Sequence, residues 1–291
     1  MGYGSYRSPY SHGGSKWPMI AALVVIPVAV ICAAVFGLSA YLSTDKIDES
    51  YCYAHANQHH VAFYVDASFT ASSSDQQWRD YETALMRAYD QSPPNAQISI
   101  FTTTRDAASS FLPPVGSQCR PASTPEEQTV ISAPGQPAPY LARQAEEARA
   151  AYGQLVAQVL DDLRNEDLQA QESAILSSLQ AISRSEYFAT DSRTLWFLTD
   201  GLENSEIARF GQVRGDAPPY EVFASQPRFE AVRPRSLSGA QVNLLLVETA
   251  TLPQPGLDYI THAEIRAFWS AIMTENGAES VELTRLRHGA G

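Results

Sequence analysis

Short, continuous apolar runs separated by polar stretches restrict the fold of this chain more than any other feature. Residues 60–66 read HVAFYVD and residues 194–201 read TLWFLTDG, so an aspartate follows each apolar run. A third run of the same kind, QVNLLLVET, occupies residues 241–249. Such runs are typical of strands buried on both faces of a parallel sheet. We therefore expect a mainly parallel sheet that is covered on both sides.

Segments with helical spacing alternate with these strands. Apolar residues recur with a helical period in residues 74–91, which end before Pro93 and Pro94, and again in residues 141–163. The other elements expected from the same patterns are helices at residues 173–184 and 262–276 and strands at residues 96–104 and 279–286. This alternation predicts an α/β fold, a three-layer Rossmann-like sandwich with a mainly parallel sheet.

Prolines are concentrated in residues 105–139. This stretch holds seven prolines and has little apolar periodicity. We expect a long loop there, within one domain, and no second core.

One long uncharged stretch precedes the expected domain. Residues 17–44 contain no Asp, Glu, Lys, Arg or His. At about 1.5 Å of rise per residue, a helix of about 25 residues spans roughly 37 Å, more than the roughly 30 Å hydrocarbon layer of a membrane. We expect a single transmembrane helix. A cleaved signal peptide is the alternative, with Gly37–Ser39 as a cleavage site, but the apolar stretch exceeds the roughly 7–15 residues of a signal peptide.

The charges that flank this stretch predict its orientation. Arg7 and Lys16 precede it and no acidic residue does, so the positive-inside rule leaves the N-terminus in the cytoplasm. We expect a single-pass membrane protein whose C-terminal domain lies outside the cytoplasm. The predicted organisation is a disordered cytoplasmic tail at 1–16, the transmembrane helix at 17–44, a polar juncture at 45–59, the domain at 60–287 and a tail at 288–291.

The net charge argues against a nucleic-acid partner. The chain has 20 Lys and Arg against 32 Asp and Glu, a formal charge of −12. Binding to a phosphate backbone requires a basic surface. We expect no nucleic-acid binding.

Oxygen-bearing side chains follow two of the expected strands. Asp66, Ser68 and Thr70 lie in the loop after the first strand, and Asp200 follows the strand at 194–199. In a parallel sheet, ligands collect where the carboxyl ends of the strands meet. Carboxylates and hydroxyls are ligands of hard divalent cations such as Mg²⁺ and Ca²⁺. The pattern predicts a metal site, with Mg²⁺ as the expected ion and Mn²⁺ or Ca²⁺ as alternatives.

These motifs resemble the von Willebrand factor type A domain, whose metal-ion-dependent adhesion site uses a D-x-S-x-S loop, a threonine and a later aspartate. The loop corresponds to Asp66, Ser68 and Thr70, with threonine in place of the last serine. The segment ESAILSSLQAI places Ser173 where the family has threonine, and T-D-G places Asp200. The resemblance covers about residues 58–287. It implies a protein partner whose carboxylate completes the shell of the ion.

Within this family, the chain is most similar to a subgroup of membrane-anchored bacterial proteins. The resemblance implies a cysteine-proline loop after the second strand, here Ser117–Pro121, and a late aromatic pair, here Phe268 and Trp269, near Gly277 and Ala278. We expect a component of a secretion, conjugation or surface-assembly apparatus. The subgroup has no well-defined biochemical role, but it implies a place in the bacterial inner membrane with the C-terminal domain in the periplasm. It does not imply an oligomeric state.

Three other interpretations of the two aspartates stay open. Asp66 and Asp200 could cap the helices that follow them. A vestigial metal site in a structural domain is the second. The third is a phosphate-ester hydrolase of the haloacid-dehalogenase kind, which needs a second aspartate where this chain has Ser68, and also a late lysine. Because Lys16 and Lys46 are the only lysines, we expect no enzymatic activity.

Two further features have alternative interpretations. Outside the cytoplasm, Cys52 and Cys119 could form a disulfide or remain free thiols. The arginine-containing stretch at 205–239 could recognise a partner, or it could be an insertion that covers the sheet.

Overall fold

The computed structural model describes residues 28, 30–32, 34–35, 47–53, 56, 58–103, 112–133, 135–165, 173–210, 219–248 and 261–287. The chain divides into two compact units, residues 1–45 and 46–291. In the first unit, the described residues are helical. No helix among the described residues has both the length and the apolar character needed to cross a membrane. Most of the span predicted at 17–44, and the tails at 1–16 and 288–291, lie outside the described residues.

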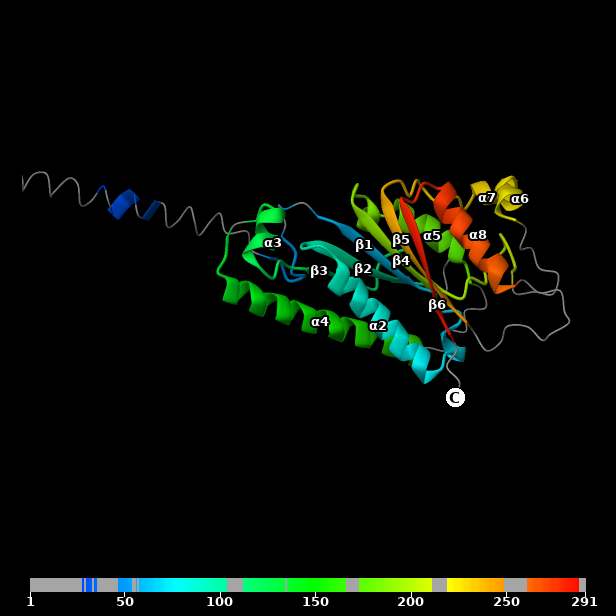
Figure 1. Ribbon diagram of the computed structural model, residues 1–291, viewed down its shortest axis with the longest axis horizontal. Coiled ribbons are helices and arrows are strands. Elements are labelled where there is room, and N and C mark those ends of the chain that lie inside the picture. Colours follow the sequence, from blue (N-terminus) through cyan, green and yellow to red (C-terminus); the bar gives the residue numbers. More distant parts are fainter. Residues whose placement is uncertain are drawn as a thin grey trace, which may run out of the picture. The chain divides into compact units, whose positions relative to one another are not determined.

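The second unit is built on a six-stranded sheet (Figure 1). Its strands are β1 (His60–Val65), β2 (Ala96–Thr102), β3 (Gly116–Arg120), β4 (Arg193–Thr199), β5 (Ala240–Val247) and β6 (Ser280–Leu286). Their order is β3-β2-β1-β4-β5-β6, and every neighbouring pair is parallel except β2 and β3. This confirms the prediction of a mainly parallel sheet. The direction of the strand order reverses between β1 and β4, the position where ligands collect in such folds.

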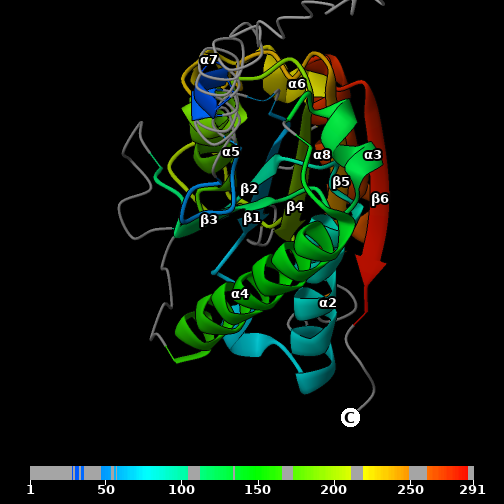
Figure 2. The ribbon, with the colours of Figure 1, turned by 90° about the vertical axis from the view of Figure 1, so that its left-hand side faces the viewer.

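Helices cover both faces of the sheet (Figures 1 and 2). One face carries α2 (Asp75–Gln91) and α4 (Ala138–Asn165), and the other carries α5 (Ile175–Arg184), α6 (Tyr220–Ala224), α7 (Pro227–Glu230) and α8 (His262–Glu275). Successive residues of β1 point to opposite faces of the sheet. Phe63 packs on the face that carries α2 and α4, Tyr64 packs on the face that carries α5 to α8, and both are fully buried. The predicted three-layer sandwich is therefore confirmed.

The central strands β1 and β4 bring the two predicted aspartates to one edge. Their register pairs Val65 with Leu198. The backbone N–H of Asp66 donates to the carbonyl of Leu198 at 2.9 Å, which extends the pairing by one residue. Asp66 and Asp200 therefore leave the sheet from the carboxyl ends of adjacent strands.

The expectation of one long loop at 105–139 was wrong. Strand β3 and helix α3 (Pro125–Val130) lie within it, and the predicted cysteine-proline loop at 117–121 is mostly strand β3. As an edge strand, β3 pairs antiparallel with β2 through backbone groups, so it needs no continuous apolar run. Helix α3 starts at Thr124, whose hydroxyl accepts the N–H of Glu127.

A disulfide joins the segment before the domain to β3. Cys52 and Cys119 form the bridge, with their Cα atoms 5.0 Å apart. The carbonyl of Ser50 also accepts the N–H of Cys119 at 2.8 Å, and Tyr53 is buried against Ala122. Residues 47–53, expected to be a solvated juncture, thus pack against the edge of the sheet.

The described residues of the stretch at 205–239 cover the sheet. Its aromatic residues Phe210, Phe223 and Phe229 are fully buried in the core that α8 shares. The exposed Arg233 forms an ion pair with Glu230 and lies over the ring of Phe229. In its described part, the stretch has the architecture of a covering insertion.

Candidate metal centre at the carboxyl edge of the sheet

The carboxylate of Asp66 is the centre of the hydrogen-bond network at this edge. It is fully buried. Its Oδ1 accepts the backbone N–H of Ser68 at 3.0 Å and the hydroxyl of Thr103 at 3.2 Å. Its Oδ2 accepts the hydroxyls of Thr199 at 2.8 Å and Ser173 at 3.2 Å. Loops after β1, β2 and β4, and the segment before α5, therefore converge on one side chain.

The two predicted serines form a chain of hydrogen bonds that leads to Asp66. The half-buried Ser68 donates its hydroxyl to the hydroxyl of Ser173 at 3.0 Å, and Ser173 donates onward to the carboxylate. Although Ser173 is 107 residues from Asp66 in the sequence, the fold brings its hydroxyl to the Asp66 carboxylate. Both hydroxyl oxygens keep lone pairs that can coordinate a cation.

Thr70 makes a local contact. Its buried hydroxyl donates to the carbonyl of Ala67 at 2.8 Å, which closes a turn in the loop after β1. The structure therefore places Thr70 in the same loop as Asp66, but its hydroxyl is used for the backbone of that loop.

Asp200 is buried beside Asp66. Burial and then the negative charge of Asp66 raise the pKa of Asp200 to about 7. Its Oδ1 accepts the backbone N–H of Leu202 at 2.9 Å. The following Gly201 has a φ of 76°, and its carbonyl accepts the indole N–H of Trp269 at 3.0 Å. The close approach of Trp269 fixes the loop that carries Asp200.

Neither aspartate caps a described helix, so that interpretation was wrong. Ser74 caps α2 through a capping box with Gln77. Asp66 and Asp200 instead accept the N–H two residues later, from Ser68 and Leu202, which is the pattern of an Asx turn.

A third buried carboxyl lies near this pair. Glu203 is fully buried, and burial, with a contribution from the charge of Asp66, raises its pKa to about 8. Its Oε2 accepts the N–H of Leu176 at 2.9 Å, and its Oε1 accepts the hydroxyl of Ser205. Both oxygens of Glu203 are thus used to hold α5 and its own loop.

The donor set fits a hard divalent cation better than a soft one. Two buried carboxylates repel each other when both are charged, and a cation between them removes that repulsion. Asp66, Asp200, Ser68 and Ser173 offer oxygen ligands. Within the described ranges, no group of three or more His, Cys, Asp or Glu side chains is arranged to hold a metal. A bound ion would therefore depend on hydroxyls, water or a partner to complete its shell.

Sequence reasoning did not identify Thr103, Thr199 or Glu203 as parts of this edge. Thr103 directly follows β2 and Thr199 ends β4, so both stand at the carboxyl end of a strand, as Asp66 does. That position is a signal that could have identified the two threonines. No comparable signal marks Glu203, whose role depends on which helix its loop meets.

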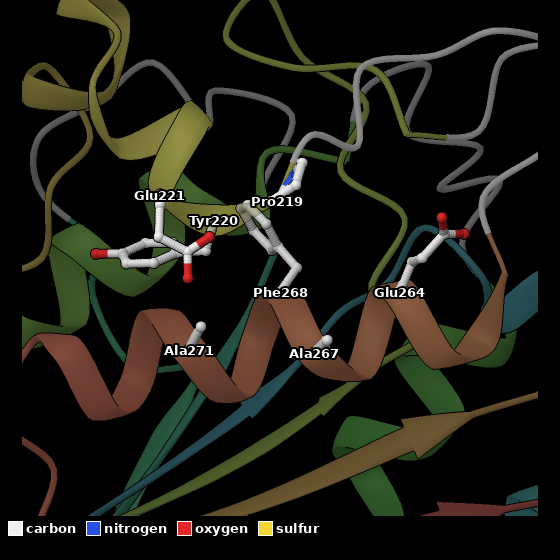
Figure 3. Close-up of a pocket in the computed structure, with 7 residues that line it drawn as sticks. All are labelled: Pro219, Tyr220, Glu221, Glu264, Ala267, Phe268 and Ala271. Atoms are coloured by element: carbon white, nitrogen blue, oxygen red, sulfur yellow. The ribbon is translucent and has the colours of Figure 1, made fainter.

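A separate hollow lies between α6 and α8 (Figure 3). Its volume is about 250 Å³, and its lining consists of Pro219, Tyr220, Glu221, Glu264, Ala267, Phe268 and Ala271. The two residues of the predicted aromatic pair have different contacts. Phe268 lines the hollow, whereas the indole N–H of Trp269 donates to the carbonyl of Gly201. None of the predicted metal-site residues lines it.

Similarity to known proteins is found at the level of the fold. No protein-family profile and no curated protein matches the chain. The fold is similar to the crystal structure of an aerotolerance-related membrane protein from Bacteroides fragilis NCTC 9343, which carries multiple mutations to serines. The two share 16% sequence identity with a TM-score of 0.37, and the match covers 79% of this chain and 92% of the other. This likeness is too distant to carry a functional argument.

Proposed function

We propose that this chain is a membrane-anchored protein of the bacterial envelope whose outer domain binds another protein through a divalent cation. The domain presents the carboxyl edge of its sheet to the partner. Asp66, Ser68, Ser173 and Asp200 hold Mg²⁺, with Mn²⁺ or Ca²⁺ as alternatives. A carboxylate of the partner completes the shell of the ion. The chain acts as a component of an envelope assembly and catalyses no reaction.

The position of Asp66 carries this proposal. Its carboxylate collects hydroxyl groups from three separate parts of the chain, and Asp200 lies near enough for the charge of Asp66 to raise its pKa. A buried carboxyl pair of this kind is costly for a structural domain unless a cation or a proton neutralises it. The resemblance to type A domains supports the cation, and the mainly parallel sheet agrees with that resemblance.

Two observations support the location outside the cytoplasm. Disulfides persist in oxidising compartments, and Cys52 and Cys119 form one. The uncharged stretch at 17–44, preceded by basic residues alone, is suited to anchor the chain with its N-terminus inside.

Calorimetric titration of the full chain in mild detergent with MgCl₂ and MnCl₂ tests the cation. We expect binding by the unchanged chain and none by Asp66→Asn, which keeps the shape of the side chain but removes its charge. Asp161→Asn is the matched control, because Asp161 is exposed on α4. Equal heats from the unchanged chain and Asp66→Asn would refute cation binding at this edge.

Affinity capture with and without a chelator tests the partner. A partner that is lost with chelator, and also lost with Asp66→Asn, supports cation-dependent binding. A partner retained in both cases supports a structural domain with a vestigial site.

A further inference from the structure

Glu203 caps a helix from a distant loop. Helix α5 is ten residues long, and its first N–H groups have no partner within the helix. The residue at its N-cap, Ala174, has no side chain that could serve. Oε2 of Glu203 instead accepts the N–H of Leu176, the second residue of the helix, at 2.9 Å.

The same loop holds Ser173 by its backbone. The N–H of Ser173 donates to the carbonyl of Asn204, and the N–H of Asn204 donates to the carbonyl of Ser173, both at 2.9 Å. Ser173 lies two residues before α5. The loop after β4, which starts with Asp200, therefore holds the segment around Ser173 at two points. Asn204 pairs with the backbone of Ser173, and Glu203 bonds to the start of α5.

We propose that Glu203 is a positioning residue for the cation site, setting the distance between Ser173 and Asp66; this inference rests on the proposed function. The bond from Leu176 to Glu203 fixes the first turn of α5 relative to the loop that carries Asp200. The hydroxyl of Ser173 is thereby held 3.2 Å from Oδ2 of Asp66. When that bond is lost, the start of α5 loosens and Ser173 leaves this geometry. Residues that orient metal ligands in this way typically change metal affinity about 10–100-fold when replaced.

Two conservative variants separate the length of the Glu203 side chain from its carboxyl group. Glu203→Gln keeps the length of the side chain and an oxygen that can accept from Leu176, and the hydroxyl of Ser205 can rotate to accept from the new amide. Glu203→Asp keeps the carboxyl group but is one methylene shorter, so it no longer reaches Leu176. We expect Glu203→Asp to weaken Mg²⁺ binding by the full chain about 10-fold or more, and Glu203→Gln to weaken it much less. Glu206→Asp and Glu206→Gln are matched controls, because Glu206 is exposed in the same loop.

A double-mutant cycle separates positioning from a merely structural role. If Glu203 acts through Ser173, Glu203→Asp has little further effect on Mg²⁺ affinity once Ser173→Ala is present. A merely structural role predicts additive losses, or lower thermal stability with unchanged Mg²⁺ affinity, and either result would overturn the inference. Faster hydrogen exchange at the amides of Leu176 and Ser173 in metal-free Glu203→Asp is also expected. Unchanged exchange would show that Glu203 does not hold α5.

The two levels of the proposal fail in different ways. Absence of Mg²⁺ binding by the unchanged chain contradicts the proposed function, and the positioning role with it. Mg²⁺ binding by the unchanged chain that is equally tight in Glu203→Asp contradicts the positioning role alone.

Discussion

The hydroxyl of Ser173 donates to the carboxylate of Asp66 at 3.2 Å, across 107 residues of sequence. This contact joins the segment before α5 to the loop after β1 and places both beside the loop that carries Asp200. A cation at this edge would use Ser173 either as a direct ligand or as a group that orients Asp66.

Replacement of Ser173 tests that role. Ser173→Ala removes the hydroxyl, and we expect Mg²⁺ affinity to fall about 10-fold or more. Ser173→Thr restores a hydroxyl and the residue type that the family resemblance expects, so it should bind nearly as tightly as the unchanged chain. Calorimetry on the full chain measures both. A Ser173→Ala variant that binds normally would exclude this hydroxyl from the site.

The raised pKa values of Asp200 and Glu203 predict how stability depends on pH. The folded state keeps these protons up to pH values of about 7 and 8, whereas the unfolded state releases them near 4. Their stabilising contribution is therefore complete below pH 4, decreases as the pH rises above 4, and is fully lost once the pH has passed 7 to 8. The pKa values of His59, His60 and His262 are lowered chiefly by burial, so these side chains are neutral above pH 7.

Urea denaturation in EDTA between pH 7 and 8.5 measures this dependence. We expect the free energy of unfolding to fall with rising pH, and to fall less in Glu203→Gln, because the pKa of Glu203 lies within this range. Mg²⁺ should offset the loss most at the higher pH, where it no longer competes with the protons. A free energy that is constant across this range in the unchanged chain would contradict the raised pKa values.

The backbone at Gly201 predicts a strained alanine variant. Gly201 has a φ of 76°, and an added Cβ would lie 2.5 Å from Cγ2 of Ile265 and 2.9 Å from Nε1 of Trp269. We expect Gly201→Ala to lower the free energy of unfolding by roughly 1–3 kcal/mol and to weaken Mg²⁺ binding through Asp200. Gly153→Ala is the control, because Gly153 lies in α4 with open space around its Cα. That change should stabilise the helix by about 0.5–1 kcal/mol.

The disulfide predicts a redox-dependent stability. The bridge from Cys52 to Cys119 spans 67 residues, and closing a loop of that size contributes about 4 kcal/mol in the chain-entropy model. We expect Cys52→Ser with Cys119→Ser to lower the free energy of unfolding by about that amount, and reductant to act only on the unchanged chain. Equal stability of the two proteins in the absence of reductant would show that the bridge contributes nothing.

Apolar patterning was sufficient to predict the central strands and the long helices. Strands β1 and β4 and helix α2 contain buried apolar residues at the spacing of their element, so their sequences report their environment. Strand β3 has the sequence GSQCR and is held by backbone pairing, by the disulfide and by Gln118, whose amide donates to the carbonyl of Ala148. Such long-range contacts leave no local period. Helix α3 carries a different local signal, a threonine cap followed by proline, which apolar spacing does not report.

The part of the candidate site that lies at the ends of strands could be predicted from the sequence. Asp66 and Asp200 directly follow adjacent parallel strands, which sequence patterns can indicate. Ser173 required the family resemblance, because its segment reaches the site through long-range contacts with Asn204 and Asp66 that leave no local pattern in the sequence. The role of Glu203 depends on how α5 packs against the loop after β4, and no local sequence pattern indicates that contact.

Location of a bound ion tests the central claim most directly. Anomalous diffraction from crystals of the protein grown with Mn²⁺ would show where the ion lies. The account predicts a peak within about 2.0–2.5 Å of ligand oxygens among Asp66, Ser68, Ser173 and Asp200, or bridged to them by water. Crystals in which Mn²⁺ occupies other sites and the space beside Asp66 and Asp200 shows no peak would contradict it.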